Sequence, residues 1–175
     1  MPNRKPRLYL MGGLPRAGKS TWVNRNKKDK IVIEPDDIRK EIFGHQFHAN
    51  ANGHVFALAE SMVSILLKQK KDVIIDATNI TIASRKKWKP IAEQYGAKTI
   101  VVWVYADRDI EANKRICLKR NESSPEGKKL PEDVIDRMST VFETPFLEAE
   151  LHGYETMWFD IEEYHNRERK KKSRK

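Results

Sequence analysis

The sequence predicts an α/β protein whose mostly parallel sheet is covered by helices on both faces. Short apolar runs alternate along the chain with segments of helical periodicity. The run at residues 99–105 is apolar throughout, which is typical of a strand that is buried on both faces. A glycine-rich loop, G-L-P-R-A-G-K-S at residues 13–20, lies between the first apolar run and the first helical segment. This alternation indicates parallel strands that are joined by crossover helices.

The strands are predicted from apolar runs that end at polar residues. Each run is short, and side chains able to bind ligands follow several of them directly. Because ligands gather at the carboxyl ends of parallel strands, these polar side chains are the first candidates for a site. In chain order, the expected strands are residues 7–11, 31–33, 73–75, 99–105 and 155–160.

The helices are predicted from apolar residues at helical spacing and from capping residues. Gly44 stops one helix, Thr81 is the expected N-cap of another, and Gly96 is its C-terminal stop. A further helix, between Gly44 and Thr81, is expected to bury one face through Val55, Leu58, Ala59, Met62 and Leu66. In chain order, the first expected helix opens at residue 21 and the second covers 38–43. The helix with the apolar face just described comes next, and the others cover 81–95, 109–120, 132–140 and 145–151.

The composition predicts a single cytoplasmic domain. A chain of 175 residues suits one domain, and we expect no second catalytic module. No apolar run approaches the roughly 20 residues of a membrane span, so no membrane partner is expected. Cys117 is the single cysteine and is typical of a small helix residue. The loop with His45, His48 and His54 lacks metal-site spacing, and no zinc site is predicted.

The net positive charge is concentrated at the two ends of the chain. The formal net charge is +9. Residues 1–7 carry three basic side chains and no acid, residues 167–175 carry seven basic side chains and Glu168, and residues 8–166 carry 24 of each sign. We predict a basic N-terminal arm at 1–7, a folded domain at 8–166 and a basic disordered tail at 167–175. The ends either grip nucleic-acid phosphates without regard to sequence or only aid solubility.

A full match to the phosphate-binding pattern G-x-x-x-x-G-K-[ST] occupies residues 13–20. Its glycines let the backbone turn so that successive N–H groups point at phosphate oxygens. The lysine places its charge between the β- and γ-phosphates, and the serine hydroxyl suits Mg²⁺. The pattern predicts that ATP or GTP binds here. The predicted nucleotide-binding residues are Gly13, Leu14, Pro15, Arg16, Ala17, Gly18, Lys19, Ser20 and Thr21, with Lys19 also catalytic and Ser20 also a metal ligand.

Asp36 and Arg39 are the predicted catalytic residues on the acceptor side. They follow the second expected strand, and Arg39 lies one helical turn beyond Asp36. A carboxylate in this position accepts a hydroxyl proton, and a guanidinium fork binds an acceptor phosphate. The alternative is that Asp36 or Asp37 caps the following helix and Arg39 is a surface residue. A capping box is not predicted, because the residues three positions further on are basic.

Asp76 is the predicted second metal residue and orders Mg²⁺ through water. Asp107 also ends an apolar strand and is a rival, although it is a stronger candidate for a helix start. Arg115 and Arg120 lie on the helix before a polar loop, where an arginine over the γ-phosphate would stabilise transition-state charge. Arg120, at the loop junction, is the better candidate for this catalytic and nucleotide-binding role. The alternative is that it belongs to a solvated helix face.

Four motifs in sequence order resemble those of the bacteriophage-type polynucleotide 5′-kinases and their wider P-loop kinase relatives. The resemblance extends from residue 8 to about residue 150. Four motifs in order are far more specific than a P-loop alone. They are G-L-P-R-A-G-K-S-T-W from Gly13, D-D-I-R from Asp36, D-A-T-N from Asp76, and R-N at Arg120 and Asn121, which a lid and L-P-E-D-V-I follow.

The resemblance implies a three-layer P-loop NTPase or kinase fold and a specific reaction. ATP and Mg²⁺ would serve the transfer of the γ-phosphate to the 5′-hydroxyl end of DNA or RNA, as in nucleic-acid repair. The resemblance makes Asp36 the general base, places Arg39 on the acceptor's 3′-phosphate, and lets Arg120 act from the lid. A nucleic-acid 5′-hydroxyl end is therefore the expected partner, together with ATP.

Two positions depart from the pattern of the family. Its lid often carries a second arginine beyond the R-N pair, whereas residues 122–125 here are E-S-S-P, and Lys128 or Lys129 is the candidate replacement. Ala77 follows Asp76, as in the wider family, whereas the phage enzymes place the aspartate directly before Thr-Asn. Whether the lid stabilises the transition state, and the exact role of Asp76, thus stay open.

Two other functions also stay open. The D-x-x-R motif at residues 36–39 does not by itself name the acceptor, so a small-molecule or toxin-type kinase on the same scaffold is an alternative. A nucleotide-dependent nucleic-acid-binding module without transfer activity is the third possibility, and Asp36 and Arg39 count against it. The sequence does not distinguish DNA from RNA, a single strand from a duplex end, ATP from GTP, or a monomer from an oligomer.

Overall fold

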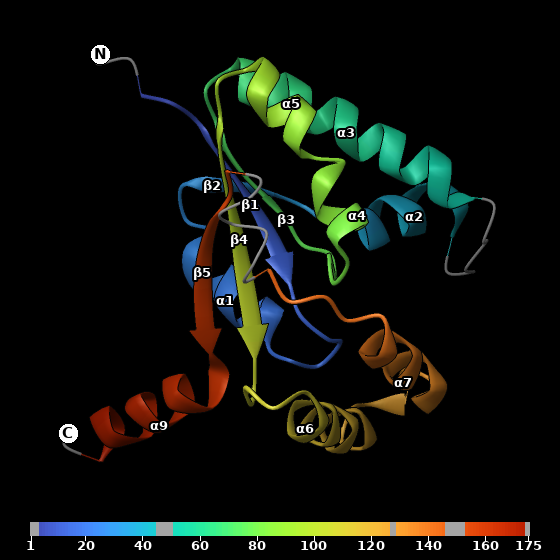
Figure 1. Ribbon diagram of the computed structural model, residues 1–175, viewed down its shortest axis with the longest axis vertical. Helices are drawn as coiled ribbons and strands as arrows, with labels where there is room; N and C mark the ends of the chain where they lie inside the picture. Colours follow the sequence, from blue (N-terminus) through green and yellow to red (C-terminus); the bar gives the residue numbers. More distant parts are fainter. Residues whose placement is uncertain (1–3, 45–50, 127–128, 146–152, 174–175) are drawn as a thin grey trace.

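Five parallel strands form the sheet, which Figure 1 shows in the computed structural model. The structure describes residues 4–44, 51–126, 129–145 and 153–173. The strand order is β2-β3-β1-β4-β5, and each neighbouring pair is parallel. The predicted α/β class and P-loop fold are confirmed. The strands are β1 (Arg7–Gly12), β2 (Lys30–Ile33), β3 (Asp72–Ile75), β4 (Lys98–Tyr105) and β5 (Glu155–Asp160).

Helices cover both faces of this sheet. On one face, Val63 of α3 and Ala92 of α5 join one buried cluster. On the other face, Val23 of α1, Cys117 of α6 and Ile135 of α7 join a second cluster. Burial raises the pKa of the Cys117 thiol to about 11, so it is an inert core residue. The helices are α1 (Lys19–Asn26), α2 (Pro35–Phe43), α3 (Asn52–Lys68), α4 (Ile82–Lys86), α5 (Lys89–Gln94), α6 (Ile110–Glu122), α7 (Glu132–Thr140) and α9 (Ile161–Lys172).

The central strand β1 explains why its sequence is apolar without alternation. Leu8 and Leu10 lie in the cluster beneath α3, and Tyr9 and Met11 lie in the cluster beneath α1. Side chains along a strand alternate between the two faces, and both faces of β1 are buried. The strand ends at Gly12, which places the P-loop at the carboxyl edge of the sheet.

The region that the sequence predicts as one helix at residues 81–95 forms two short helices instead. Thr81 is the N-cap of α4 as predicted, and its side chain accepts the Ser84 N–H in a capping box. Pro90 accounts for the break before α5, because proline is accommodated in the first turn of a helix but not in its interior. Gly96, with φ of 63°, follows α5 and ends it as predicted.

The C-terminal residues differ from the predicted disordered tail, because α9 continues to its end at Lys172. Asp160 caps this helix by accepting the Glu163 N–H at 2.9 Å. An ion pair between Arg167 and Glu163 and another between Lys171 and Glu168 follow along the helix. Pairs of this spacing stabilise a helix that is rich in like charges. Figure 1 shows α9 leading away from the sheet.

The N-terminal arm and several other predictions lie at the edges of the described residues. From residue 4 on, the arm is attached to the sheet, because Arg4 pairs with Asp72 and the Arg7 N–H donates to the same carboxylate at 3.0 Å. The domain boundaries at residues 7 and 166 stay predictions. The predictions for His45, His48 and Lys128 fall outside the described residues, as do all but the first residue of the helix predicted at 145–151.

Candidate active site

The P-loop between β1 and α1 needs its glycines for its backbone path. Gly13 has φ of 133° and Gly18 has φ of 109°, both in the region that favours glycine. A Cβ at Gly13 would lie 2.3 Å from the Val104 carbonyl oxygen, and one at Gly18 would lie 2.7 Å from the Ile161 side chain. The Gly13 N–H donates to the Thr78 carbonyl at 3.1 Å. The loop is thus fitted between β3, β4 and the start of α9.

Lys19 bends back over the loop that precedes it. Its Nζ donates to the Gly13 carbonyl at 3.0 Å and to the Leu14 carbonyl at 2.9 Å. Burial lowers the pKa of Lys19 to about 8, and the negative charge of Asp76 opposes this shift. A partly buried ammonium that hydrogen-bonds to two neutral carbonyls is suited to an anionic ligand, which would stabilise its charge.

A cavity of about 650 Å³ opens beside the P-loop and α2, and both Ser20 and Asp76 line it. Burial raises the pKa of Asp76. Burial, and to a smaller extent the negative charge of Asp76, raises the pKa of Glu34 to about 7. No group of three or more His, Cys, Asp or Glu side chains within the described ranges could hold a metal ion. Ser20 and Asp76 still fit Mg²⁺, which proteins commonly bind through one or two side chains together with phosphate oxygens and water. Asp107 lines a different cavity.

Asp36 and Arg39 form an ion pair on α2. Because α2 starts at Pro35, earlier than predicted, Asp36 lies in its first turn. The N-cap is Glu34, so neither Asp36 nor Asp37 caps the helix. The Arg39 side chain is 12% exposed and also donates to Asn52 Oδ1 at 2.8 Å, whereas Asp36 is 80% exposed. The alternative of a surface Arg39 therefore does not match the structure.

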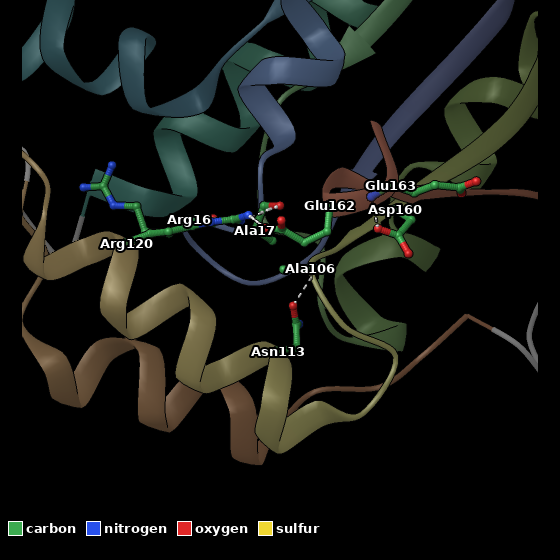
Figure 2. Close-up of polar contacts among 8 residues, drawn as sticks. All are labelled: Arg16, Ala17, Ala106, Asn113, Arg120, Asp160, Glu162 and Glu163. Atoms are coloured by element: carbon green, nitrogen blue, oxygen red, sulfur yellow. Dashed lines mark hydrogen bonds and ion pairs between the residues drawn. The ribbon is translucent and has the colours of Figure 1, made fainter. Parts of the chain in front are cut away.

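Arg120 lies against the P-loop at Arg16 and Ala17 (Figure 2). Its Nη1 donates to the Arg16 carbonyl at 3.0 Å and approaches the Ala17 carbonyl at 3.4 Å. Its Nη2 forms an ion pair with Glu162, the second residue of α9. The structure thus brings Arg120 to the loop, but its guanidinium contacts carbonyl groups and a carboxylate. Arg115, its rival from the sequence, is exposed on α6.

Asn121 links the P-loop to both ends of the polar loop that follows α6. Its Oδ1 accepts the Leu130 N–H at 3.0 Å and the Arg16 Nε–H at 3.3 Å, and its Nδ2 donates to the Leu130 carbonyl at 2.7 Å. The side chain is buried. Asn121, the second residue of the R-N motif, therefore joins the end of α6 to Leu130 and to the P-loop.

Arg85 is a positioning residue that the sequence prediction missed. It is fully buried in α4, and its Nη1 donates to the Asn79 carbonyl at 2.9 Å. Asn79 in turn donates from Nδ2 to the Met11 carbonyl at 2.8 Å, so the chain of contacts reaches β1 just before the P-loop. Its spacing in the sequence could have indicated its burial, because Arg85 precedes Trp88 by three residues and so lies on the predicted apolar face.

These features define the class of the protein. A phosphate-binding loop follows the first strand of a parallel sheet, and carboxylates follow the second and third strands at the same edge. The protein has the α/β P-loop NTPase fold that P-loop kinases share. Residues 8–145 match the AAA_33 family model, which is described as an AAA domain, and the chain belongs to this family. P-loop kinase families in general use ATP and Mg²⁺.

Similar proteins include kinases with different named acceptors. L-seryl-tRNA(Sec) kinase of Methanococcus maripaludis is 28% identical over an alignment of 151 residues, and the match covers 79% of this chain and 53% of that protein. A chain in the structure of the Pnkp1/Rnl/Hen1 RNA repair complex is 27% identical with a TM-score of 0.63, over 79% of this chain and 44% of that chain. A gluconokinase from Sinorhizobium meliloti 1021 has a TM-score of 0.56 at 17% identity, over 90% and 84% of the two chains, and shows the fold alone.

The chain therefore spans about half the length of its first two relatives. They support an ATP-dependent kinase, whereas the fold does not identify the acceptor. Where the structure describes the chain, it contains no helix that combines the length and the apolar character of a membrane span. A cytoplasmic location stays a prediction.

Proposed function

We propose that the protein is an ATP- and Mg²⁺-dependent polynucleotide 5′-hydroxyl kinase that acts on DNA or RNA ends. The observation that carries the proposal is the Asp36–Arg39 pair on α2, at the same edge of the sheet as the P-loop. The exposed Asp36 carboxylate is accessible to an incoming hydroxyl, while Asn52 helps to fix Arg39. A proton acceptor beside a phosphate-binding guanidinium suits an acceptor that carries both a hydroxyl group and a phosphate.

In the proposed reaction, Asp36 accepts the proton of the 5′-hydroxyl group as the hydroxyl oxygen attacks the γ-phosphorus. The bond between the γ-phosphorus and the β–γ bridging oxygen breaks, and ADP leaves with that oxygen. Arg39 exchanges its contact with Asp36 for the phosphate on the 3′ side of the first nucleotide and so orients the strand. Lys19 leaves the two loop carbonyls and moves its charge to the β- and γ-phosphates. Bound through Ser20 and, by way of water, Asp76, Mg²⁺ would neutralise phosphate charge.

The proposal is tested by incubating the protein with γ-labelled ATP, Mg²⁺ and a 5′-hydroxyl oligonucleotide. Asp36→Asn should lower the rate of transfer about 10²- to 10⁴-fold and leave ATP binding intact, because it removes the general base. Asp133→Asn is the control, since Asp133 is an exposed carboxylate on α7. Label that never reaches any DNA or RNA oligonucleotide with the unaltered protein would contradict the proposal.

A second candidate acceptor is supported by the acidic wall of the 650 Å³ cavity. Glu34, Asp37 and Glu41 line it together with Asp76, against a single lysine, Lys27, among its described lining residues. Such a wall repels phosphate and suits a hydroxyl substrate that also carries an amine. A seryl group is of this kind, and the relative from Methanococcus maripaludis is named for a seryl-tRNA. Label on serine or seryl-tRNA and none on oligonucleotides would favour this second acceptor.

A further inference from the structure

A second cavity, of about 340 Å³, lies at the carboxyl end of β4, and aromatic side chains form much of its wall. None of its described lining residues belongs to the larger cavity beside α2. Its volume is within the range of about 300–1,000 Å³ that is typical of small-molecule sites. The residues that matter for the argument are Trp103, Tyr105, Phe142 and Trp158, with Arg108 and Asn113 as polar members.

The aromatic wall follows from the pairing of β4 with β5. Trp103 and Trp158 are register partners, so their side chains project from the same face of the sheet. The Tyr105 ring meets the Trp158 ring edge-on at 6.0 Å, and Phe142 lies 4.9 Å from Trp103 between ring centroids. Trp103 is 1% exposed and Tyr105 is 6% exposed, whereas Trp158 is 42% exposed. Trp158 therefore offers aromatic surface at the opening of the cavity.

Two polar groups complement this aromatic surface. Asn113 is 1% exposed, and its Oδ1 accepts the Ala106 N–H at 2.9 Å (Figure 2). Its amide nitrogen makes no hydrogen bond with any described residue, so a donor is left at the cavity wall. Arg108 is exposed at the rim and pairs with no carboxylate in the described ranges. Asp107 lies on the same rim, where its carboxylate accepts the Asp109 N–H at 2.9 Å.

We propose that this cavity binds one nucleotide unit, whose base stacks on Trp158 and whose phosphate lies at Arg108. Bases stack on aromatic side chains whatever their sequence, and a ring nitrogen or carbonyl oxygen of the base is a partner for the Asn113 amide. A protein or lipid occupant would not require this combination of a stacking ring, an amide donor and a cation.

The strand that is phosphorylated is the source of this nucleotide, a choice that rests on the proposed function. The cavity and the P-loop share a wall, because a Cβ at Gly12 would lie 2.4 Å from the Trp103 ring. A strand whose end reaches the P-loop thus passes the same edge of the sheet. A free nucleotide has the same chemistry and is the other possible source.

The test uses the full chain with Mg²⁺ and a non-hydrolysable ATP analogue bound, so that the P-loop is occupied. A 5′-hydroxyl octanucleotide with a 3′ fluorophore is titrated in one arm, and AMP is titrated in the other. Trp158→Ala should weaken octanucleotide binding about tenfold, in line with base–aromatic stacking. Arg108→Gln should weaken it several-fold and reduce its salt dependence.

Met157→Ala is the matched control, because Met157 is also 42% exposed but projects from the opposite face of β5. Trp158→Phe keeps an aromatic ring and should retain most of the affinity, which separates stacking from misfolding. Loss of AMP binding in Trp158→Ala, with unchanged octanucleotide binding, would assign the cavity to a free nucleotide. Equal affinities of Trp158→Ala, Arg108→Gln and Met157→Ala for both ligands would overturn the proposal.

The same experiment separates this inference from the proposed function. Binding that depends on Trp158, in a protein that transfers no phosphate to oligonucleotides, would overturn the kinase proposal and leave the cavity assignment. Transfer to oligonucleotides without any effect of Trp158→Ala on binding would overturn the cavity assignment and leave the kinase proposal.

Discussion

Lys19 is expected to take up a proton when ATP binds at alkaline pH. Burial lowers its pKa to about 8 in the free protein, from an ordinary value of 10.5. Phosphate oxygens favour the charged ammonium and raise the pKa again. Binding therefore prefers the protonated form, and affinity is greatest below pH 8 and falls as the pH rises through this value. The neutral fraction of Lys19 grows from about a tenth at pH 7 to about nine-tenths at pH 9, so affinity falls about tenfold.

Isothermal titration calorimetry at pH 8.5, in two buffers of different ionisation enthalpy, measures this uptake directly. About three-quarters of a proton should be taken up for each ATP bound. Lys19→Arg keeps the charge at this pH, so any binding that it retains should proceed without uptake. Lys87→Met is the control, because burial also lowers the pKa of Lys87, which lies beside Phe56. An ATP affinity that is constant from pH 7 to pH 9, without uptake, would refute the reasoning.

Three further perturbations follow from the described contacts. Gly13→Ala should weaken ATP binding at least about tenfold, because its Cβ would lie 2.3 Å from the Val104 carbonyl oxygen, whereas Gly53→Ala, with nothing near its Cβ, should not. Arg85→Met should lower the free energy of unfolding by about 2–4 kcal/mol in urea denaturation, because it leaves the buried Asn79 carbonyl and the part-buried Glu143 carbonyl without this donor. Removing residues 167–175 should weaken oligonucleotide binding mainly at low salt, and an unchanged salt slope would contradict this.

The strands were predictable because burial on both faces leaves a local record in the sequence. The apolar run at residues 99–105 is β4 almost to the residue. Two helical features were not predicted, for different reasons. Pro90 is a local signal of the break between α4 and α5, but the apolar spacing of the region favoured one continuous helix. Residues 167–172 continue α9, and ion pairs at helical spacing support this helix, whereas the prediction of a tail rested on the run of like charges alone.

The candidate site was predictable where its parts are close in sequence. The P-loop is one continuous motif, and the pair of Asp36 and Arg39 follows from helical spacing. Contacts between distant segments were not predictable. Arg85 acts through the Asn79 carbonyl, and Glu162 reaches Arg120 from a helix that begins 41 residues later, at Ile161. Neither pairing leaves a pattern in a single sequence, because only the assembled sheet brings these elements together.

The contacts of Arg120 bear on the lid role that the family resemblance implies. Its guanidinium binds the Arg16 carbonyl and Glu162, so it must release at least one of them to reach a γ-phosphate. The pair with Glu162 is partly exposed, at 28% and 41% of the two side chains, and pairs of this kind contribute about 1 kcal/mol or less. An arginine that stabilises the transition state of phosphoryl transfer contributes several times as much. The pair with Glu162 is therefore too weak to keep Arg120 from the proposed reaction, and α9 helps to set the position of Arg120 only in the free protein.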